Sequence, residues 1–78
     1  MKSVNIKLST IKDAQSLVGV LAKYKVDLDL KSGRYTVDAR SLIGIFAFDW
    51  SQPVELIIHS TDEAQVDAVL ADVKDWIV

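Results

Sequence analysis

Hydroxyl side chains stand where helical patterns begin. Thr10 precedes an apolar stripe at helical spacing over residues 14–24, and Ser41 precedes the apolar residues 42–46. The unpaired amides and the dipole at a helix N-terminus favour an anion such as phosphate. Lys12 adds a positive charge beside Thr10, whereas Asp13 places a carboxylate in the same turn and opposes an incoming phosphate. Thr10 and Ser41 are therefore candidate N-caps, at helix ends that would also favour an anion.

The other chemistry-bearing residues form no catalytic set. The chain has one histidine, His59, and no cysteine. It has no His, Cys and acidic cluster at metal-ligand spacing, no glycine-rich phosphate loop and no nucleophile–base pair. A lone histidine before a helix is most often solvent-facing or hydrogen-bonded for structural reasons. We therefore predict a protein that is not an enzyme and has no catalytic residue, metal or cofactor.

Length and charge narrow the class of protein. The 78 residues are enough for one small domain, residues 1–78. The net charge is −2 with no basic block, so neither nucleic acid nor an anionic membrane is an expected partner. No apolar run approaches the ~20 residues of a membrane span, and the N-terminus alternates instead of forming a signal-peptide core. We expect a soluble, cytoplasmic domain.

Hydrophobic periodicity predicts alternating strands and helices. Apolar residues alternate with polar ones at 4–8, 26–31, 35–38 and 54–58, which is typical of strands with one buried face. Turn residues at 31–34 predict a hairpin. Helical spacing follows Thr10, Ser41 and Ser60, and Ser60 with Glu63 has capping-box spacing. The order β-α-β-β-α-β-α predicts an α+β fold, an open-faced sandwich of a four-stranded antiparallel sheet with three helices on one side.

Two short motifs carry a family resemblance over essentially the whole chain. Residues 41–44 give a serine at the start of a short apolar helix, then two aliphatic residues and a glycine. Residues 23–28 lead the first helix into the second strand. In residue type and spacing these motifs resemble the histidine-containing phosphocarrier (HPr) family of the bacterial sugar phosphotransferase system (PTS). The resemblance implies the same sandwich, an HPr-like domain.

The resemblance ends at the reactive group. The family begins its first helix with histidine, alanine, arginine and proline; counting back from Tyr24, the matching residues here are Thr10, Ile11, Lys12 and Asp13. A threonine phosphate ester is far more inert than a phosphorylated imidazole, so Thr10 cannot take over as a relay. In the family's strand arrangement His59 lies about 16 Å from Thr10 and cannot substitute. Thr10 and Lys12 thus mark a degenerate phosphocarrier position.

Ser41 has two interpretations. In the Gram-positive part of the family the matching serine is phosphorylated by a dedicated kinase, and the product docks on a transcriptional regulator. A phosphate at Ser41 would meet a helix N-terminus, and Arg40 next to it could neutralise some charge. The simpler interpretation is that Ser41 only caps the helix, and we favour it.

The helix after Ser41 is a candidate partner-binding surface. Leu42, Ile43 and Phe46, with Phe48 and Trp50 nearby, are more large apolar groups than one short helix and loop can bury. The family docks enzyme I and other partners here, although core packing with ordinary exposed surface explains the residues equally well.

The leading hypothesis is an HPr-like protein that lacks histidine phosphotransfer and acts as a regulatory protein-binding module. Its partners would be phosphotransferase-system or regulatory proteins, and Ser41 is its candidate regulatory phosphosite. One alternative is an atypical carrier or phosphoryl acceptor modified at Thr10, Ser41 or His59. The other is a structural or oligomerisation domain.

Overall fold

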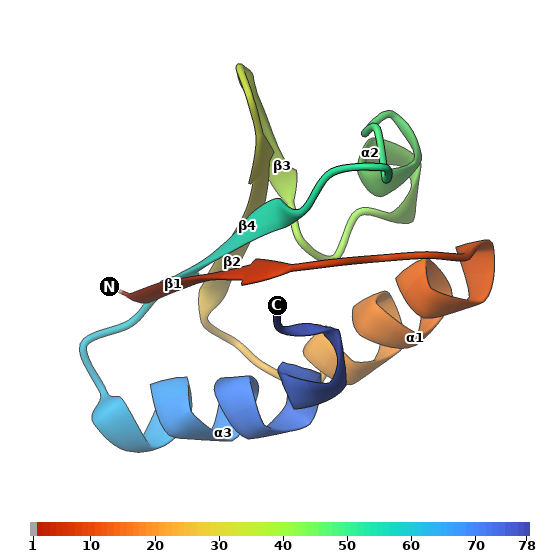
Figure 1. Cartoon of the computed structure of the whole chain (residues 1–78). Coiled ribbons are helices and arrows are strands. Elements are labelled where there is room, and N and C mark those ends of the chain that lie inside the picture. Colours follow the sequence, from red (N-terminus) through yellow and green to blue (C-terminus); the bar gives the residue numbers. More distant parts are fainter. Residues whose placement is uncertain (1) are drawn as a thin grey trace.

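Strands and helices alternate along residues 2–78, the part of the chain that the computed structural model describes (Figure 1). The strands are β1 (Lys2–Ile6), β2 (Asp27–Ser32), β3 (Tyr35–Asp38) and β4 (Val54–His59). The helices are α1 (Ile11–Leu21), α2 (Leu42–Phe46) and α3 (Glu63–Val73), and a 3₁₀ turn, η1 (Lys74–Trp76), follows α3. This is the element order that the periodicity predicts.

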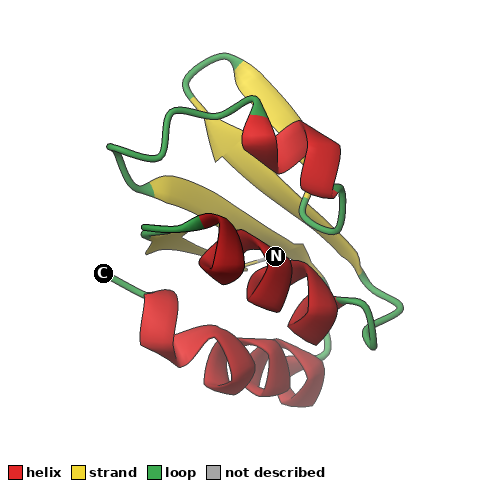
Figure 2. Cartoon of the chain, turned by 90° about the vertical axis from the view of Figure 1, so that its right-hand side faces the viewer, coloured by secondary structure: helices red, strands yellow, loops and turns green. Residues whose placement is uncertain are grey.

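The four strands form one antiparallel sheet in the order β1-β4-β2-β3. All three helices lie on the same side of it, which leaves the other face open (Figure 2). The predicted open-faced α+β sandwich is therefore confirmed. Because β4 runs antiparallel to β1, the start of β4 lies beside the end of β1, with Ile6 opposite Val54.

Alternation along the strands supplies the core. Every second residue of a strand faces the helices, and each helix packs one buried face against the sheet. The largest fully buried side chains come from the inward positions of the strands and the inner faces of α1, α2 and α3: Ile6, Leu17, Leu21, Leu28, Leu30, Ile45, Leu56, Ile58, Val69 and Val73. The hairpin turns at Gly33, whose φ of 60° is the left-handed conformation that a type II′ turn needs from its first central residue.

The first strand lies earlier than its apolar pattern suggests. Residues 4–8 are the predicted strand, whereas β1 spans Lys2–Ile6. Its partner β4 begins at Val54, so Lys7 and Leu8 have no strand opposite them on that side. The Lys7 amide instead donates to the carbonyl of Trp76, and Leu8 is buried without strand pairing. Burial therefore preserves the alternation beyond the end of the strand.

The predicted capping box at Ser60 and Glu63 is wrong. Asp62 is the N-cap of α3, and its Oδ1 accepts hydrogen bonds from the amides of Ala64 and Gln65. The Ser60 hydroxyl donates instead to Gln65 Oε1 and accepts from the Asp62 amide. Two neighbouring acceptors compete for the same free amides, and the aspartate, which is closer to the first turn, takes them. Within residues 2–78, no helix has the length and apolar character that a membrane span needs.

Candidate functional site

The N-terminus of α1 has a carboxylate, that of Asp13, in its first turn. Thr10, in extended conformation, is the N-cap, and its hydroxyl accepts a hydrogen bond of 3.1 Å from the Asp13 amide. In return Asp13 Oδ2 accepts from the amide of Ser9 at 3.0 Å and from that of Thr10 at 3.3 Å. These bonds, the Ser9 bond most strongly, lower the pKa of the Asp13 carboxyl below its ordinary value. A negative charge is therefore already fixed at the N-terminus of α1, where it would repel a bound phosphate.

The flanking residues of this turn are open to solvent. Lys12 is exposed, and Ile11 keeps 60% of its surface accessible. Sequence patterns give no reason to single out Ile11, because it falls at the first helical position and outside the buried stripe. Lys7, just before this turn, donates from Nζ to the Trp50 carbonyl at 2.7 Å. That bond joins the entrance of α1 to the segment after α2, so both lie at one end of the molecule (Figure 1).

Ser41 caps α2, as the simpler interpretation predicts. Its backbone is extended, and its Oγ accepts from the Gly44 amide at 3.2 Å. Gly44 allows α2 to approach β3 closely, since a Cβ at this position would lie 3.0 Å from the Cβ of Val37 and 3.2 Å from the Ser41 Oγ. The serine and the glycine of the 41–44 motif therefore act together: one satisfies the first turn of α2, and the other lets that turn pack.

The apolar surplus around α2 is smaller than the sequence suggests. Phe48 is buried, at 9% exposure, and Leu42 packs partly against the core. Trp50 is also half-buried, and its indole N–H donates to the Ile45 carbonyl at 2.9 Å. Ile43 remains 86% exposed and Phe46 48% exposed. We call Ile43 and Phe46, together with the half-buried Leu42 between them and the core, the α2 surface.

Of three comparisons with known proteins, the one with solved structures found matches. No family model matches the chain, and no curated protein is similar to it. Among solved structures, HPr-C-His from Thermoanaerobacter tengcongensis is 23% identical, with 96% of this chain and 93% of that chain covered and a TM-score of 0.75. The phosphocarrier protein HPr from Bacillus anthracis str. Ames is also 23% identical, with coverage of 92% and 93% and a TM-score of 0.67. The fold is HPr-like. Similarity at this level of identity extends to the fold and no further.

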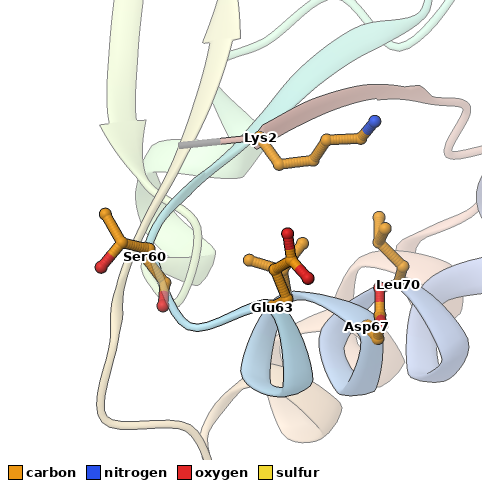
Figure 3. Close-up of a pocket in the computed structure, with 7 residues that line it drawn as sticks. Lys2, Ser60, Glu63, Asp67 and Leu70 are labelled. Atoms are coloured by element: carbon orange, nitrogen blue, oxygen red, sulfur yellow. The ribbon is translucent and has the colours of Figure 1, made fainter.

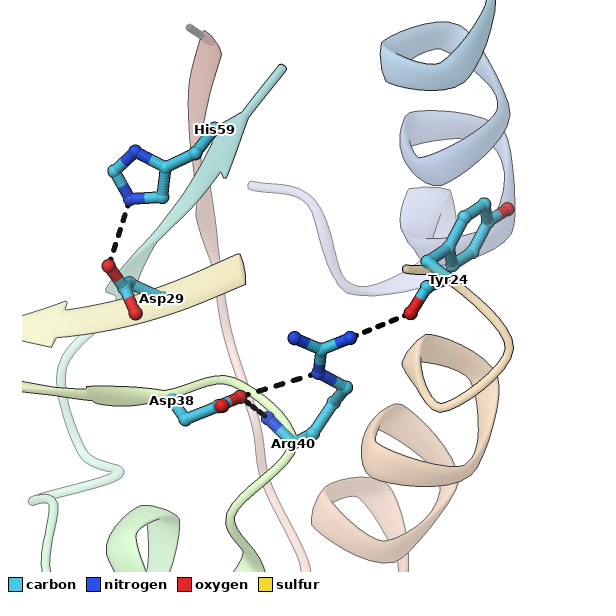
Figure 4. A network of polar contacts seen from close by, with 5 residues as sticks. All are labelled: Tyr24, Asp29, Asp38, Arg40 and His59. Atoms are coloured by element: carbon cyan, nitrogen blue, oxygen red, sulfur yellow. Dashed lines mark hydrogen bonds and ion pairs between the residues drawn. The ribbon is translucent and has the colours of Figure 1, made fainter. Parts of the chain in front are cut away.

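Arg40 contacts Tyr24 and Asp38. Its Nη1 donates to the Tyr24 carbonyl at 2.7 Å, and its Nε lies 3.4 Å from Asp38 Oδ1, which also accepts the Arg40 amide at 2.8 Å (Figure 4). These contacts hold Arg40 in the unmodified protein, and its role as a counter-charge for a phosphate on Ser41 stays a prediction. The guanidinium ties the end of α1 to the loop that leads into α2, so Arg40 positions α2.

His59 lies away from the α1 entrance. The pairing of β1 with β4 places Val54 opposite Ile6, and His59 is at the other end of β4. Its Nε2 is 2.8 Å from Asp29 Oδ2 on the open face of the sheet (Figure 4). The expectation of a hydrogen-bonded histidine is confirmed, and Asp29 is its partner. Within residues 2–78, no three metal-ligating side chains gather into a binding site.

Sequence reasoning misses the link between α1 and α3. The Tyr24 hydroxyl donates to Asp72 Oδ2, which also lies 2.7 Å from Lys23 Nζ. Burial, with a further contribution from Asp72, raises the pKa of Tyr24 to about 12. Lys23, followed by the Tyr24 hydroxyl, lowers the pKa of Asp72. Asp72 is 48 positions from Tyr24 in the sequence, so no local pattern could indicate this contact.

Proposed function

We propose that this HPr-like domain is a protein-binding module that does not relay phosphoryl groups and serves phosphotransferase-system or regulatory proteins in the bacterial cytoplasm. The observation that carries the proposal is the Asp13 carboxylate bound to the Ser9 and Thr10 amides. A phosphoryl group at the start of α1 would lie beside this fixed negative charge, which repels it.

Modification of Thr10 itself is opposed by the same geometry. Its hydroxyl oxygen already accepts the Asp13 amide, so a phosphoryl group on that oxygen would lie close to Asp13. The group would also bring a charge of about −1.5 to −2 beside the Asp13 carboxylate. Lys12 is exposed and supplies only a solvent-screened cation against this repulsion. Thr10 and Lys12 therefore remain as traces of a carrier site.

Phosphotransfer is tested by incubating the protein with phosphoenolpyruvate and enzyme I of the phosphotransferase system. We expect no phosphorylated product by intact-mass spectrometry. The Bacillus anthracis phosphocarrier, treated in parallel, should gain one phosphoryl group. Acid-labile phosphate on the present chain, mapped to Thr10, Ser41 or His59, would establish the atypical-carrier alternative and overturn the proposal.

Docking is assigned to the α2 surface. Two large apolar side chains lie exposed on one short helix, and the buried centre of a protein interface is more apolar than the rest of the surface and enriched in aromatic residues. The backbone beneath is held by the Ser41 cap, the Gly44 contact with β3 and the Arg40 bond to Tyr24. A fixed backbone lowers the entropy lost on binding.

The docking test uses Ile43→Asp and Phe46→Asp with enzyme I as the probe. Each variant should weaken binding about tenfold or more in calorimetry, because truncated interface anchors typically cost at least ~2 kcal/mol. Tyr35→Asp is the matched control, since Tyr35 is 73% exposed but lies on β3. Equal loss in all three variants, or no binding by the parent protein, would contradict enzyme I as a partner. A dimer that Phe46→Asp dissociates in sedimentation would favour the oligomerisation alternative.

Ser41 is the proposed control point of the α2 surface. Its hydroxyl is half-buried and lies one residue from Leu42 and two from Ile43, so a phosphate there would add charge next to the docking groups. Treatment with the family's serine kinase and ATP should phosphorylate the parent protein and leave Ser41→Ala unmodified. Modification of both proteins would place the phosphate elsewhere and remove Ser41 from the proposal.

A further inference from the structure

An open groove of about 500 Å³ lies at the opposite end of β1 from the α1 entrance. Lys2 of β1 forms one wall, and Glu63, Val66, Asp67 and Leu70 of α3 form the other (Figure 3). Val66 and Leu70 are half-buried and supply an apolar floor, whereas Glu63 and Asp67 are exposed, one helical turn apart. Lys2 extends across the groove above α3 (Figure 3).

The outer edge of β1 borders this groove. β1 is the terminal strand of the sheet, and the end of the chain already pairs with part of its edge. The Lys7 amide donates to the Trp76 carbonyl at 2.8 Å, and the Val78 amide donates to the Asn5 carbonyl at 3.0 Å. Ile77 thereby forms an antiparallel bridge with Ile6. This edge is therefore able to hold an antiparallel strand.

The pairing stops before the groove. Backbone groups of alternate residues point to the same side of a strand, so Ser3 faces outward like Asn5 and Lys7. Among residues 2–78, no backbone hydrogen bond beyond the sheet reaches Ser3. A strand that continued the line of Ile77 and Val78 would pass Val4 and Lys2, and its residues opposite these two would point toward the helices and into the groove.

We infer that the β1 edge and this groove bind an extended segment of a partner protein, antiparallel to β1, with a lysine or arginine among its inward residues. The long stem of such a residue would pack on Val66 and Leu70 while its charge reaches Glu63 and Asp67. Within residues 2–78, neither carboxylate forms an ion pair, so both are available. The mode is strand addition to a sheet edge, with side-chain pockets giving specificity.

The net charge of the groove favours a basic segment over an acidic one. Two acidic groups and one lysine line the groove, which leaves a net negative charge for a basic segment. Lys2 competes with the incoming cation for the same carboxylates, so its removal should strengthen binding. The site is separate from the α2 surface, and its failure would leave the proposed docking function untouched.

The test is an amide chemical-shift titration with a short, end-capped peptide in which threonines alternate with lysine and valine. Shifts should gather at Ser3 to Asn5 and along residues 63–70. Glu63→Gln and Asp67→Asn should each weaken binding about two- to fivefold, the range of an exposed ion pair, and Lys2→Gln should strengthen it. Asp75→Asn, an exposed carboxylate in η1 outside the groove, should change nothing.

Two control peptides separate backbone pairing from charge attraction. N-methylation of the amides that face β1 should abolish binding, and glutamate in place of lysine should weaken it beyond the effect of Glu63→Gln. The absence of shifts at millimolar peptide refutes the inference. Shifts confined to α2, or a dimer of this chain formed through β1, do the same.

Discussion

Gly44→Ala should destabilise the protein, although alanine is the better helix former. The added Cβ would lie 3.0 Å from the Cβ of Val37 and 3.2 Å from its Cγ1, which is closer than packed carbons normally approach. Overpacking of this kind costs about 1–3 kcal/mol, and the gain in helix propensity offsets up to ~1 kcal/mol. We expect a net loss of about 1 kcal/mol in the free energy of unfolding, or about 4–8 °C in Tm for a domain of this size.

Gly19→Ala provides the matched control. Gly19 lies inside α1, and a Cβ there would have no neighbour within 4 Å. The same substitution should stabilise the protein by about 0.5–1 kcal/mol. Urea unfolding followed by tryptophan fluorescence measures both variants. If Gly44→Ala proves as stable as the parent protein, α2 does not press on β3 as described, and the fixed backbone of the α2 surface loses its main support.

Three further predictions concern caps and titrating groups. Asp62→Ala should lower the free energy of unfolding by about 0.5–2 kcal/mol in urea denaturation, because Asp62 is the N-cap of α3; an unchanged midpoint would contradict that assignment. Tyr24 has a raised pKa of about 12, so its protonated form stabilises the fold below pH ~10, and stability should fall as the pH rises toward 12; Tyr24→Phe should remove that loss, and an identical alkaline profile would refute it. Asp13 has a lowered pKa, so its contribution is present above the ordinary aspartate pKa and is lost as the pH falls through the folded value. Asp13→Ala should flatten this part of the acid unfolding profile, and an unaltered profile would argue against the Ser9 bond.

The sequence of this protein by itself determines its elements and their order. Alternation in Val54, Leu56 and Ile58 predicts a buried strand face, and all three side chains are at most 3% exposed. The caps at Thr10 and Ser41 are equally readable, because an N-cap depends on residues within one turn of helix. The missing histidine at the α1 entrance is also a sequence observation, and it shapes the functional proposal.

Only the tertiary structure decided which apolar groups stay exposed and which polar groups meet. Phe48 and Ile43 are both large apolar residues, so composition does not distinguish them. Phe48 is buried, whereas Ile43 is 86% exposed. The Arg40 bond to Tyr24 and the Lys2 wall of the groove likewise join segments far apart in the sequence. Such contacts depend on where whole elements pack against one another. Local periodicity records which face of an element is buried but not which partner covers it.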